Sequence, residues 1–84
     1  MNKHPNLVKI GKKIREMREA KGFSQEDFAA QADLARTYYG RIERGEQNLS
    51  AQNLIRIAFA LRVEVGELFP PLSSLKKPKD RERE

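Results

Sequence analysis

The strongest constraint on the fold is a tight turn between two short helical segments near the middle of the chain. The first segment opens at Ser24, whose hydroxyl is a favoured helix cap, and continues to about Ala32. The second extends from about Arg36 to Arg44 and is followed by Gly45, which suits a left-handed helix end. So short a connection does not allow the two helices to lie antiparallel. They must cross at a steep angle and pack against the rest of the chain.

Three further segments have helical character. Apolar residues recur at three- and four-residue steps, which predicts an amphipathic helix over residues 7–20 that ends at Gly22. A helix capped by Ser50 extends to about residue 62, and a last helical turn covers residues 65–69 before two prolines stop it. No stretch alternates with period two. The predicted fold class is therefore all-α, with five short helices around one core.

The length of the chain fits one small domain. Its 84 residues are fewer than most domains contain, so a second domain is not expected. The sequence after Pro70-Pro71 carries mixed charge without an apolar period. We therefore expect an N-terminal arm over residues 1–6, a folded domain over residues 7–69 and a mobile charged tail over residues 70–84.

The composition excludes several kinds of chemistry. The chain has no Cys and a single His, His4, so it offers neither a disulfide framework nor the usual zinc ligands. No catalytic Ser-His-Asp set or glycine-rich phosphate loop is present, so we expect no enzyme activity, no metal and no cofactor. The longest apolar run, residues 57–61, is far shorter than the roughly 20 residues that cross a bilayer. We expect a cytoplasmic protein without a membrane partner.

The charge of the chain favours a polyanionic partner. Lys and Arg number 17 against 12 Asp and Glu, a formal net charge of +5. Such an excess attracts nucleic acid, but it also fits a simple solvated surface. Charge alone does not choose between these two interpretations.

The two helices around the short turn have the arrangement of a helix-turn-helix, whose second helix enters the DNA major groove. The motifs SQE, RTY, IERG and the ending ALRVEVGELF follow one another in the order and spacing of a known domain. Over about residues 7–69 the chain resembles the lambda-repressor-like, XRE-family DNA-binding domain. Restriction-modification controllers, phage repressors and stand-alone regulators of this family can be as small as this chain.

One face of the second helix is suited to reading DNA. A rotation of about 100° per residue places its polar side chains and a glycine in one arc of about 140°. Arginine can donate two parallel hydrogen bonds to guanine, threonine offers a hydroxyl and a methyl group, and glycine allows close backbone approach. We expect base contacts from Arg36, Thr37, Gly40 and Arg41. The alternatives are a solvated helix face for the arginines and a tolerated surface glycine at Gly40.

The resemblance also implies contacts to the DNA backbone. The matching positions are Gln25 at the start of the first helix of the motif, and Arg44 and Asn48 at and after the end of the second. Ala35 stands where the family usually has a Ser or Thr that caps the helix and touches a phosphate. Here it can offer only its backbone N–H, and the missing cap costs about 1 kcal/mol.

The resemblance further implies a structural ion pair between Arg18 and Glu43, which joins the reading helix to the first helix. Two positions that are commonly Gly in the family carry other residues. Asp33 either caps the reading helix from outside or fills a left-handed turn position, where Asp is tolerated. Arg62 replaces the glycine that ends the fourth helix, which leaves the geometry of the next turn open.

Phe59 stands where the family usually has a polar residue, and with Ile55 it forms an apolar pair on the flank of the fourth helix. The pair either adds packing against the last helix or the tail, or forms a dimer interface together with Val65. We expect the dimer. The sequence therefore predicts a transcriptional regulator that binds double-stranded DNA as a homodimer on a palindromic operator. The alternative is an antitoxin-type protein that binds DNA and neutralises a partner protein, with residues 72–84 folding on that partner.

Overall fold

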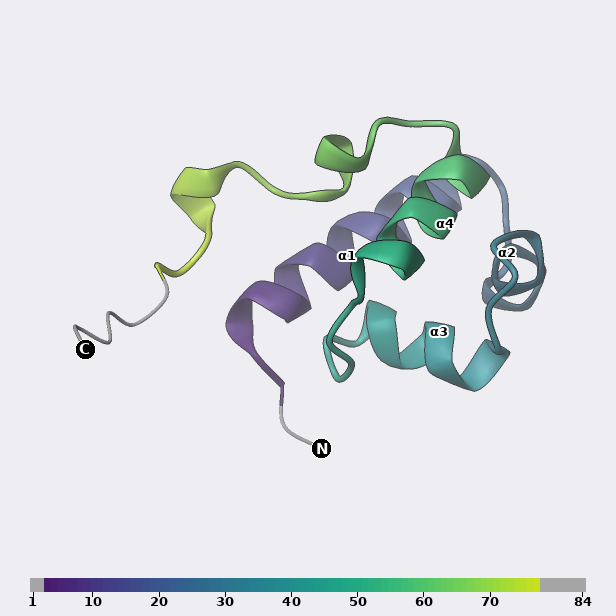
Figure 1. The fold of residues 1–84 in the computed structure, drawn as a ribbon, viewed down its shortest axis with the longest axis horizontal. Helices are drawn as coiled ribbons and strands as arrows, with labels where there is room; N and C mark the ends of the chain where they lie inside the picture. The colour runs from purple at the N-terminus through teal and green to yellow at the C-terminus, as the bar shows by residue number, and fades with distance from the viewer. Residues whose placement is uncertain (1–2, 78–84) are drawn as a thin grey trace.

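The computed structural model describes residues 3–77, and over this range the chain forms four α-helices and two short 3₁₀ helices (Figure 1). Their bounds are α1 Pro5–Ala20, α2 Gln25–Gln31, α3 Arg36–Glu43, α4 Ala51–Leu61, η1 Val65–Leu68 and η2 Leu72–Ser74. Helix α3 packs against α1 and α2, while η1 packs against α4 and α1. The all-α fold class is confirmed, and the predicted fifth helix is a 3₁₀ turn.

The core joins all of these elements except η2. Phe28 of α2 is fully buried, and its ring lies 5.5 Å from the ring of Phe23 and 5.2 Å from that of Tyr39 in α3. The other buried apolar side chains are Ile10, Ile14, Ala29, Ala32, Ile42, Ile57, Ala58, Leu61 and Leu68. Because α2 and α3 share this core with α1 and α4, the tight pair is held as one rigid unit.

Side chains cap three of the four α-helices within the described residues. The hydroxyls of Ser24 and Ser50 each accept a backbone N–H three residues on, at 3.0 and 3.1 Å, as predicted. Helix α1 begins at Pro5, earlier than the predicted residue 7, because His4 caps it and proline suits the first helical position. Part of the expected N-terminal arm is therefore helix.

The segment after Pro70 differs from the expected mobile tail. Leu72–Ser74 forms η2, and Lys76 exchanges two hydrogen bonds with Asn6 at 2.7 and 2.8 Å. We call residues 69–77 the C-terminal strap. A tail prediction based on mixed charge and the lack of an apolar period missed it, because its bonds are to backbone groups of the strap. Residues 78–84 of the expected tail lie outside the described residues.

Candidate nucleic-acid interface

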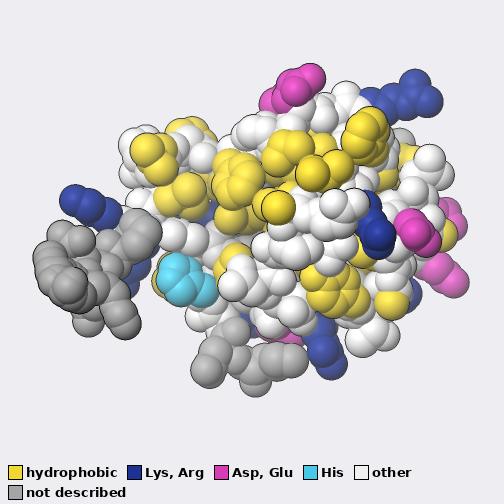
Figure 2. Space-filling view, viewed as in Figure 1, with side chains coloured by type: hydrophobic (Ala, Val, Ile, Leu, Met, Phe, Trp, Pro, Cys, Tyr) yellow, Lys and Arg dark blue, Asp and Glu magenta, His cyan; other side chains and the backbone are white. Residues whose placement is uncertain are grey.

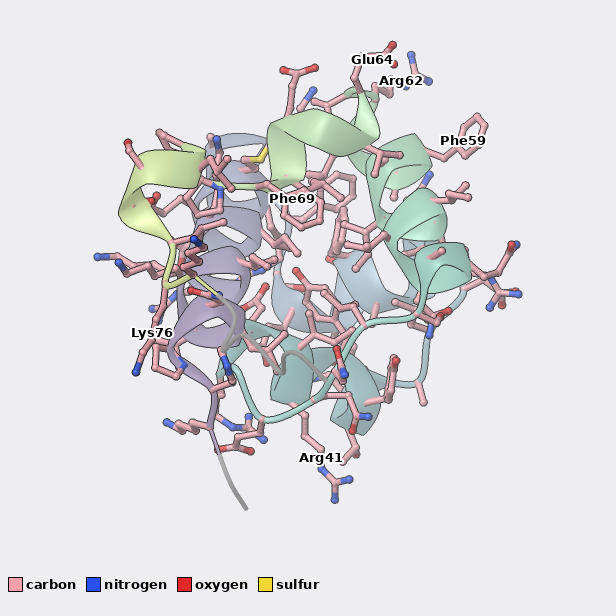
Figure 3. All side chains as sticks on the ribbon, turned by 60° about the vertical axis from the view of Figure 1, so that its left-hand side comes forward. Arg41, Phe59, Arg62, Glu64, Phe69 and Lys76 are labelled. Carbon is pink, nitrogen blue, oxygen red and sulfur yellow. The ribbon has the colours of Figure 1, made fainter. Side chains whose placement is uncertain are left out.

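Helix α3 divides into a buried and an outward face, as its periodicity predicts. Tyr39, Ile42 and Glu43 are buried, and Tyr38 is half-buried and bonded to Asn53. Arg36, Thr37 and Arg44 are exposed, and Arg41 is half-buried. Figure 3 shows Arg41 projecting from α3 away from the body of the molecule. Three of the four expected base-contacting residues therefore have side chains that reach solvent.

Positive charge on this face is largely unneutralised. Within residues 3–77, neither Arg36 nor Arg41 forms an ion pair with a carboxylate. Arg44 has a partner, Glu46, with 3.2 Å between Nε and Oε1, but this pair is partly in solvent. A solvated ion pair of this kind contributes little free energy, so Arg44 can leave it for another anion.

Gly40 lies beneath two arginine side chains. A Cβ added to Gly40 would stand 3.2 Å from Nη1 of Arg36 and of Arg44, and 3.7 Å from Oε1 of Gln25. The glycine is consequently buried, which the helical pattern did not predict. Two guanidinium groups come together over its backbone, and a close approach of DNA to Gly40 requires them to move aside.

The start of α3 has no side-chain cap. Ala35 precedes the helix and makes no capping bond, so the first N–H groups of the helix are left for other acceptors. Asp33 has φ 59°, so it takes the left-handed turn position, the second of the two alternatives. Its carboxylate does not cap α3. Helix starts of this kind suit phosphate oxygens.

Gln25 has a structural bond that the sequence did not reveal. Its Nε2 donates to Oε1 of Glu43 at 2.8 Å, and a carboxylate can only accept, which fixes the orientation of the amide. One of the two side-chain N–H groups of Gln25 is therefore occupied. The second N–H and the backbone N–H remain for a phosphate contact from this residue.

The end of α3 is held by a buried ion pair. Arg18 Nε lies 2.6 Å from Oε2 of Glu43, and a second bond joins Arg18 Nη2 to Oε1 at 3.1 Å. Arg18 also donates to the carbonyl of Phe23 at 2.7 Å, and the Tyr39 hydroxyl donates to Glu43. Burial alone would raise the pKa of Glu43, but hydrogen bonds from Arg18, Gln25 and Tyr39 outweigh it and lower that pKa. The hydrogen bond to Glu43 raises the pKa of Arg18, and burial raises that of Tyr39.

Two glycines allow α3 and α1 to meet closely. A Cβ on Gly11 would stand 2.6 Å from the backbone oxygen of Glu43, and one on Gly45 would stand 2.6 Å from Cα of Val8. Gly45 also has φ 76°, as its predicted place at a left-handed helix end requires. Gly11 was missed, although a glycine in the middle of an amphipathic helix is a signal of close packing.

An apolar hollow lies at the junction of α4 and η1. Apolar side chains gather over α4 and the segment after it (Figure 2). Ile55, Phe59 and Val65, the expected dimer residues, are all exposed and line a hollow of about 640 Å³. Phe59 is 80% exposed and projects outward (Figure 3), so its ring does not pack within the chain.

Arg62 ends α4 in the left-handed conformation, with φ 60° and ψ 47°. The turn thus keeps the geometry that glycine favours, at the expense of backbone strain. No helix within residues 3–77 has the length and hydropathy to cross a membrane. The same residues contain no cluster of three His, Cys, Asp or Glu side chains that could bind a metal ion.

Comparisons with known proteins agree on one family. A family model described as Helix-turn-helix matches residues 14–68. The control protein C.MunI of Mycoplasma sp is 46% identical over 63 residues, which cover 74% of this chain and 85% of that protein. The control protein C.BamHI of Bacillus amyloliquefaciens is 44% identical over 60 residues, with coverage of 70% and 74%.

Solved structures support the same assignment. The restriction-modification controller protein C.AhdI of Aeromonas hydrophila has a TM-score of 0.77 and 47% identity, and the match covers 79% of this chain and all of that chain. The biofilm regulator SinR of Bacillus subtilis, solved in complex with DNA, has a TM-score of 0.68 and 38% identity, with coverage of 70% and 95%. The chain therefore belongs to the XRE-like helix-turn-helix family of DNA-binding regulators and has its lambda-repressor-like fold.

Proposed function

We propose that this protein is a transcriptional regulator that binds double-stranded DNA sequence-specifically, as a homodimer on a palindromic operator. The observation that carries the proposal is the outward face of α3. Among residues 3–77, Arg36 and Arg41 on this face have no carboxylate partner, and the helix is fixed by the core and by the Arg18–Glu43 pair. A helix whose inner face is held by the core and whose outer face carries guanidinium groups suits direct readout of a major groove.

Base contacts are assigned to the exposed and projecting side of α3. Arg41 and Arg36 each suit bidentate hydrogen bonding to guanine, and Thr37 suits a hydroxyl or methyl contact in the first turn. Gly40 lies between them and leaves room for a base edge once the arginine side chains turn into the groove.

Contacts to the DNA backbone are assigned to the residues around this face. The uncapped start of α3 offers the backbone N–H at Ala35 and those that follow. Arg44 and Asn48 are exposed at and beyond the end of the helix, and Gln25 lies at the start of α2. Such contacts set the position of the protein on the duplex and do not read its sequence.

The homodimer is supported by the apolar hollow at α4 and η1. Phe59 leaves a large ring in water, and burying it on a second copy stabilises the pair by roughly 1.5 to 3 kcal/mol per side chain. Arg62, Glu64 and Glu67 also line this hollow, so its charges have both signs. A two-fold axis can bring unlike charges together across such a surface.

Dimer formation also compensates for the short length of helix α3. Helix α3 has 8 residues, so it is about 12 Å long and spans few base pairs. Two copies spaced about one DNA turn apart read enough sequence for an operator. The likeness to C.MunI and C.AhdI favours a controller of the restriction-modification kind.

The test is a comparison of variants on an operator obtained by selection from random duplexes. Arg36→Ala and Arg41→Ala should each lose roughly 1 to 3 kcal/mol of discrimination between the operator and a scrambled duplex. Arg44→Ala should weaken binding to both duplexes alike, and Arg15→Ala on the exposed part of α1 should change neither. Equal losses of discrimination in Arg36→Ala, Arg41→Ala and Arg44→Ala would refute the division into base and backbone contacts. Failure of the selection to enrich any sequence would refute the proposed function itself.

A further inference from the structure

The C-terminal strap, residues 69–77, follows α1 back toward its start. Lys13 donates to the carbonyl of Phe69 at 3.2 Å, and Lys9 donates to the carbonyl of Ser74. The strap reaches the first turn of α1, where Lys76 and Asn6 bond to each other through backbone and side-chain groups. Two of the three attachments therefore use lysine side chains, and the third holds Lys76 in a defined place.

The strap adds to a mostly basic surface, which we call the strap patch. Its lysines are Lys3, Lys9, Lys12, Lys13, Lys76 and Lys77. Within the described residues, none of these lysines forms an ion pair. Glu16 is the one acidic side chain that shares the shallow hollow between α1 and the two prolines. Within residues 3–77 the patch thus has six lysines with one carboxylate, Glu16, in its hollow, and it keeps a positive charge.

The strap patch adjoins the end of α3. Gly45, which directly follows that helix and Arg44, packs against Val8 in the first turns of α1. Asn6, the residue that holds Lys76, precedes Val8 on the same helix. In Figure 3, Lys76 lies on the flank of α1, and Arg41 projects from the side that α3 forms. The residue that follows α3 and the end of the strap therefore both border the first two turns of α1.

We propose that the strap patch is a second phosphate-binding surface, with Lys76 and Lys77 as its donors. This inference rests on the proposed function, since its ligand is the backbone of the same duplex. A phosphodiester backbone presents charges at regular intervals, so a second basic surface, on the helix that the end of α3 also borders, suits further phosphates of the same duplex. Lysines act there as point charges, which adds affinity without reading sequence. The two hydrogen bonds between Asn6 and Lys76 place the strap for this contact.

The experiment measures how operator affinity depends on salt concentration. The slope of log affinity against log salt falls by about 0.9 for each phosphate contact that is lost, or by roughly two for one contact in each protomer. The double variant Lys76→Ala, Lys77→Ala should show this decrease, on operator and scrambled duplexes alike. The matched control is Arg15→Ala, Lys21→Ala, which removes two exposed positive charges, one from α1 and one from the residue that follows it, beyond the strap.

A third variant tests whether the bonds from Asn6 position Lys76 for the phosphate contact, or whether only the charge of the lysines matters. Asn6→Ala keeps the net charge but removes the bonds that hold Lys76, so it should lower the slope in the same direction. An unchanged slope in the lysine variant would overturn the proposal, as would an equal decrease in the control. If Asn6→Ala keeps the wild-type slope while the lysine variant has a reduced slope, the bonds between Asn6 and Lys76 do not position the strap for the contact.

The same measurements separate this proposal from the proposed function. If the wild-type protein shows no preference for the selected operator, the proposed function is refuted, whatever the result with the lysine variants. A retained preference with an unaffected slope would remove the strap patch alone. Binding to vesicles of anionic lipid that the lysine variant abolishes, together with an unchanged slope on DNA, would assign the patch to a membrane surface and overturn the proposal.

Discussion

Glu43 and Arg18 meet as a buried ion pair, with 2.6 Å between Oε2 and Nε, although 25 positions separate them in the chain. Both residues are 7% exposed. The pair fixes the last turn of α3 to α1, and every oxygen of the carboxylate has a donor. Removing either partner leaves a buried charge without its main counter-charge.

We therefore expect Glu43→Ala and Arg18→Ala each to lower the free energy of unfolding by about 3 to 5 kcal/mol. The double variant should lose clearly less than the two single losses together, because the second change removes a charge that is already unpaired. Urea denaturation of the four proteins measures this. Arg15→Ala, which breaks a solvated pair with Glu19, should cost less than about 1 kcal/mol. Strictly additive losses would contradict a direct interaction between Arg18 and Glu43.

Stability should also depend on pH through Glu43. Burial opposes the change, but hydrogen bonds from Arg18, Gln25 and Tyr39 keep the folded-state pKa of Glu43 below its ordinary value of 4.5. The unfolded chain then binds a proton at higher pH than the folded chain does. The contribution of Glu43 is complete above the unfolded pKa and disappears as the pH falls through the folded pKa.

We thus expect the melting temperature of the wild type to fall more steeply with acid than that of Glu43→Gln, which is less stable at neutral pH. Thermal melts from about pH 7 to about pH 3 would show the difference. Glu26→Gln, at an exposed position in α2, is the matched control and should follow the wild type. Parallel curves for wild type and Glu43→Gln would contradict the prediction.

Gly11→Ala should destabilise the protein, even though alanine favours helix. The new methyl group meets the backbone oxygens of Ile42 and Glu43, which are parts of a helix and cannot turn away. Overpacking of this kind costs about 1 to 3 kcal/mol. Gly66→Ala is the control, because a Cβ at Gly66 has open space around it. A melting temperature of Gly11→Ala equal to or above that of the wild type would mean that α1 and α3 are further apart.

Arg62→Gly should stabilise the protein by about 1 kcal/mol, since glycine adopts the left-handed conformation without strain. Arg62→Ala removes the same side chain but keeps a Cβ, so it should give no such gain. Chemical denaturation of both variants distinguishes relief of backbone strain from loss of the arginine charge. A gain of equal size in Arg62→Ala would assign the effect to the charge.

Phe59→Lys should give a folded monomer with much weaker operator binding. The ring is 80% exposed in the single chain, so a lysine costs the fold little while it charges the proposed dimer surface. Sedimentation and gel shift measure the two effects. Leu72→Lys is the control, because Leu72 is 85% exposed and lies in η2, away from α4 and η1. A dimeric Phe59→Lys would place the interface elsewhere.

The sequence predicts the helices because their boundaries are set locally. Ser24 and Ser50 act as caps, Gly45 as a left-handed end, and the apolar spacing defines each inner face. The predicted inner face of α3 is confirmed for the same reason. The start of α1 was missed by two residues, although Pro5 at the first helical position is itself a local signal.

Other features depend on contacts between distant residues. The bond from Gln25 to Glu43, the cover of Gly40 by two arginines and the strap bond between Asn6 and Lys76 leave no periodic trace. A charged segment such as the strap resembles a solvated tail in composition. Its place on α1 is decided by carbonyl acceptors, which every sequence contains.

The two ends of helix α3 are held to the rest of the protein by different numbers of contacts. Its last turn is held by the Glu43 carboxylate and the close contact at Gly45, while its first turn follows Ala35 without a cap. We expect amide hydrogen exchange to be fast over the first turn and slow over the last, a gradient within one short helix. The fastened end then sets the angle at which the helix enters the groove, and the loose end adjusts to the local width of the DNA.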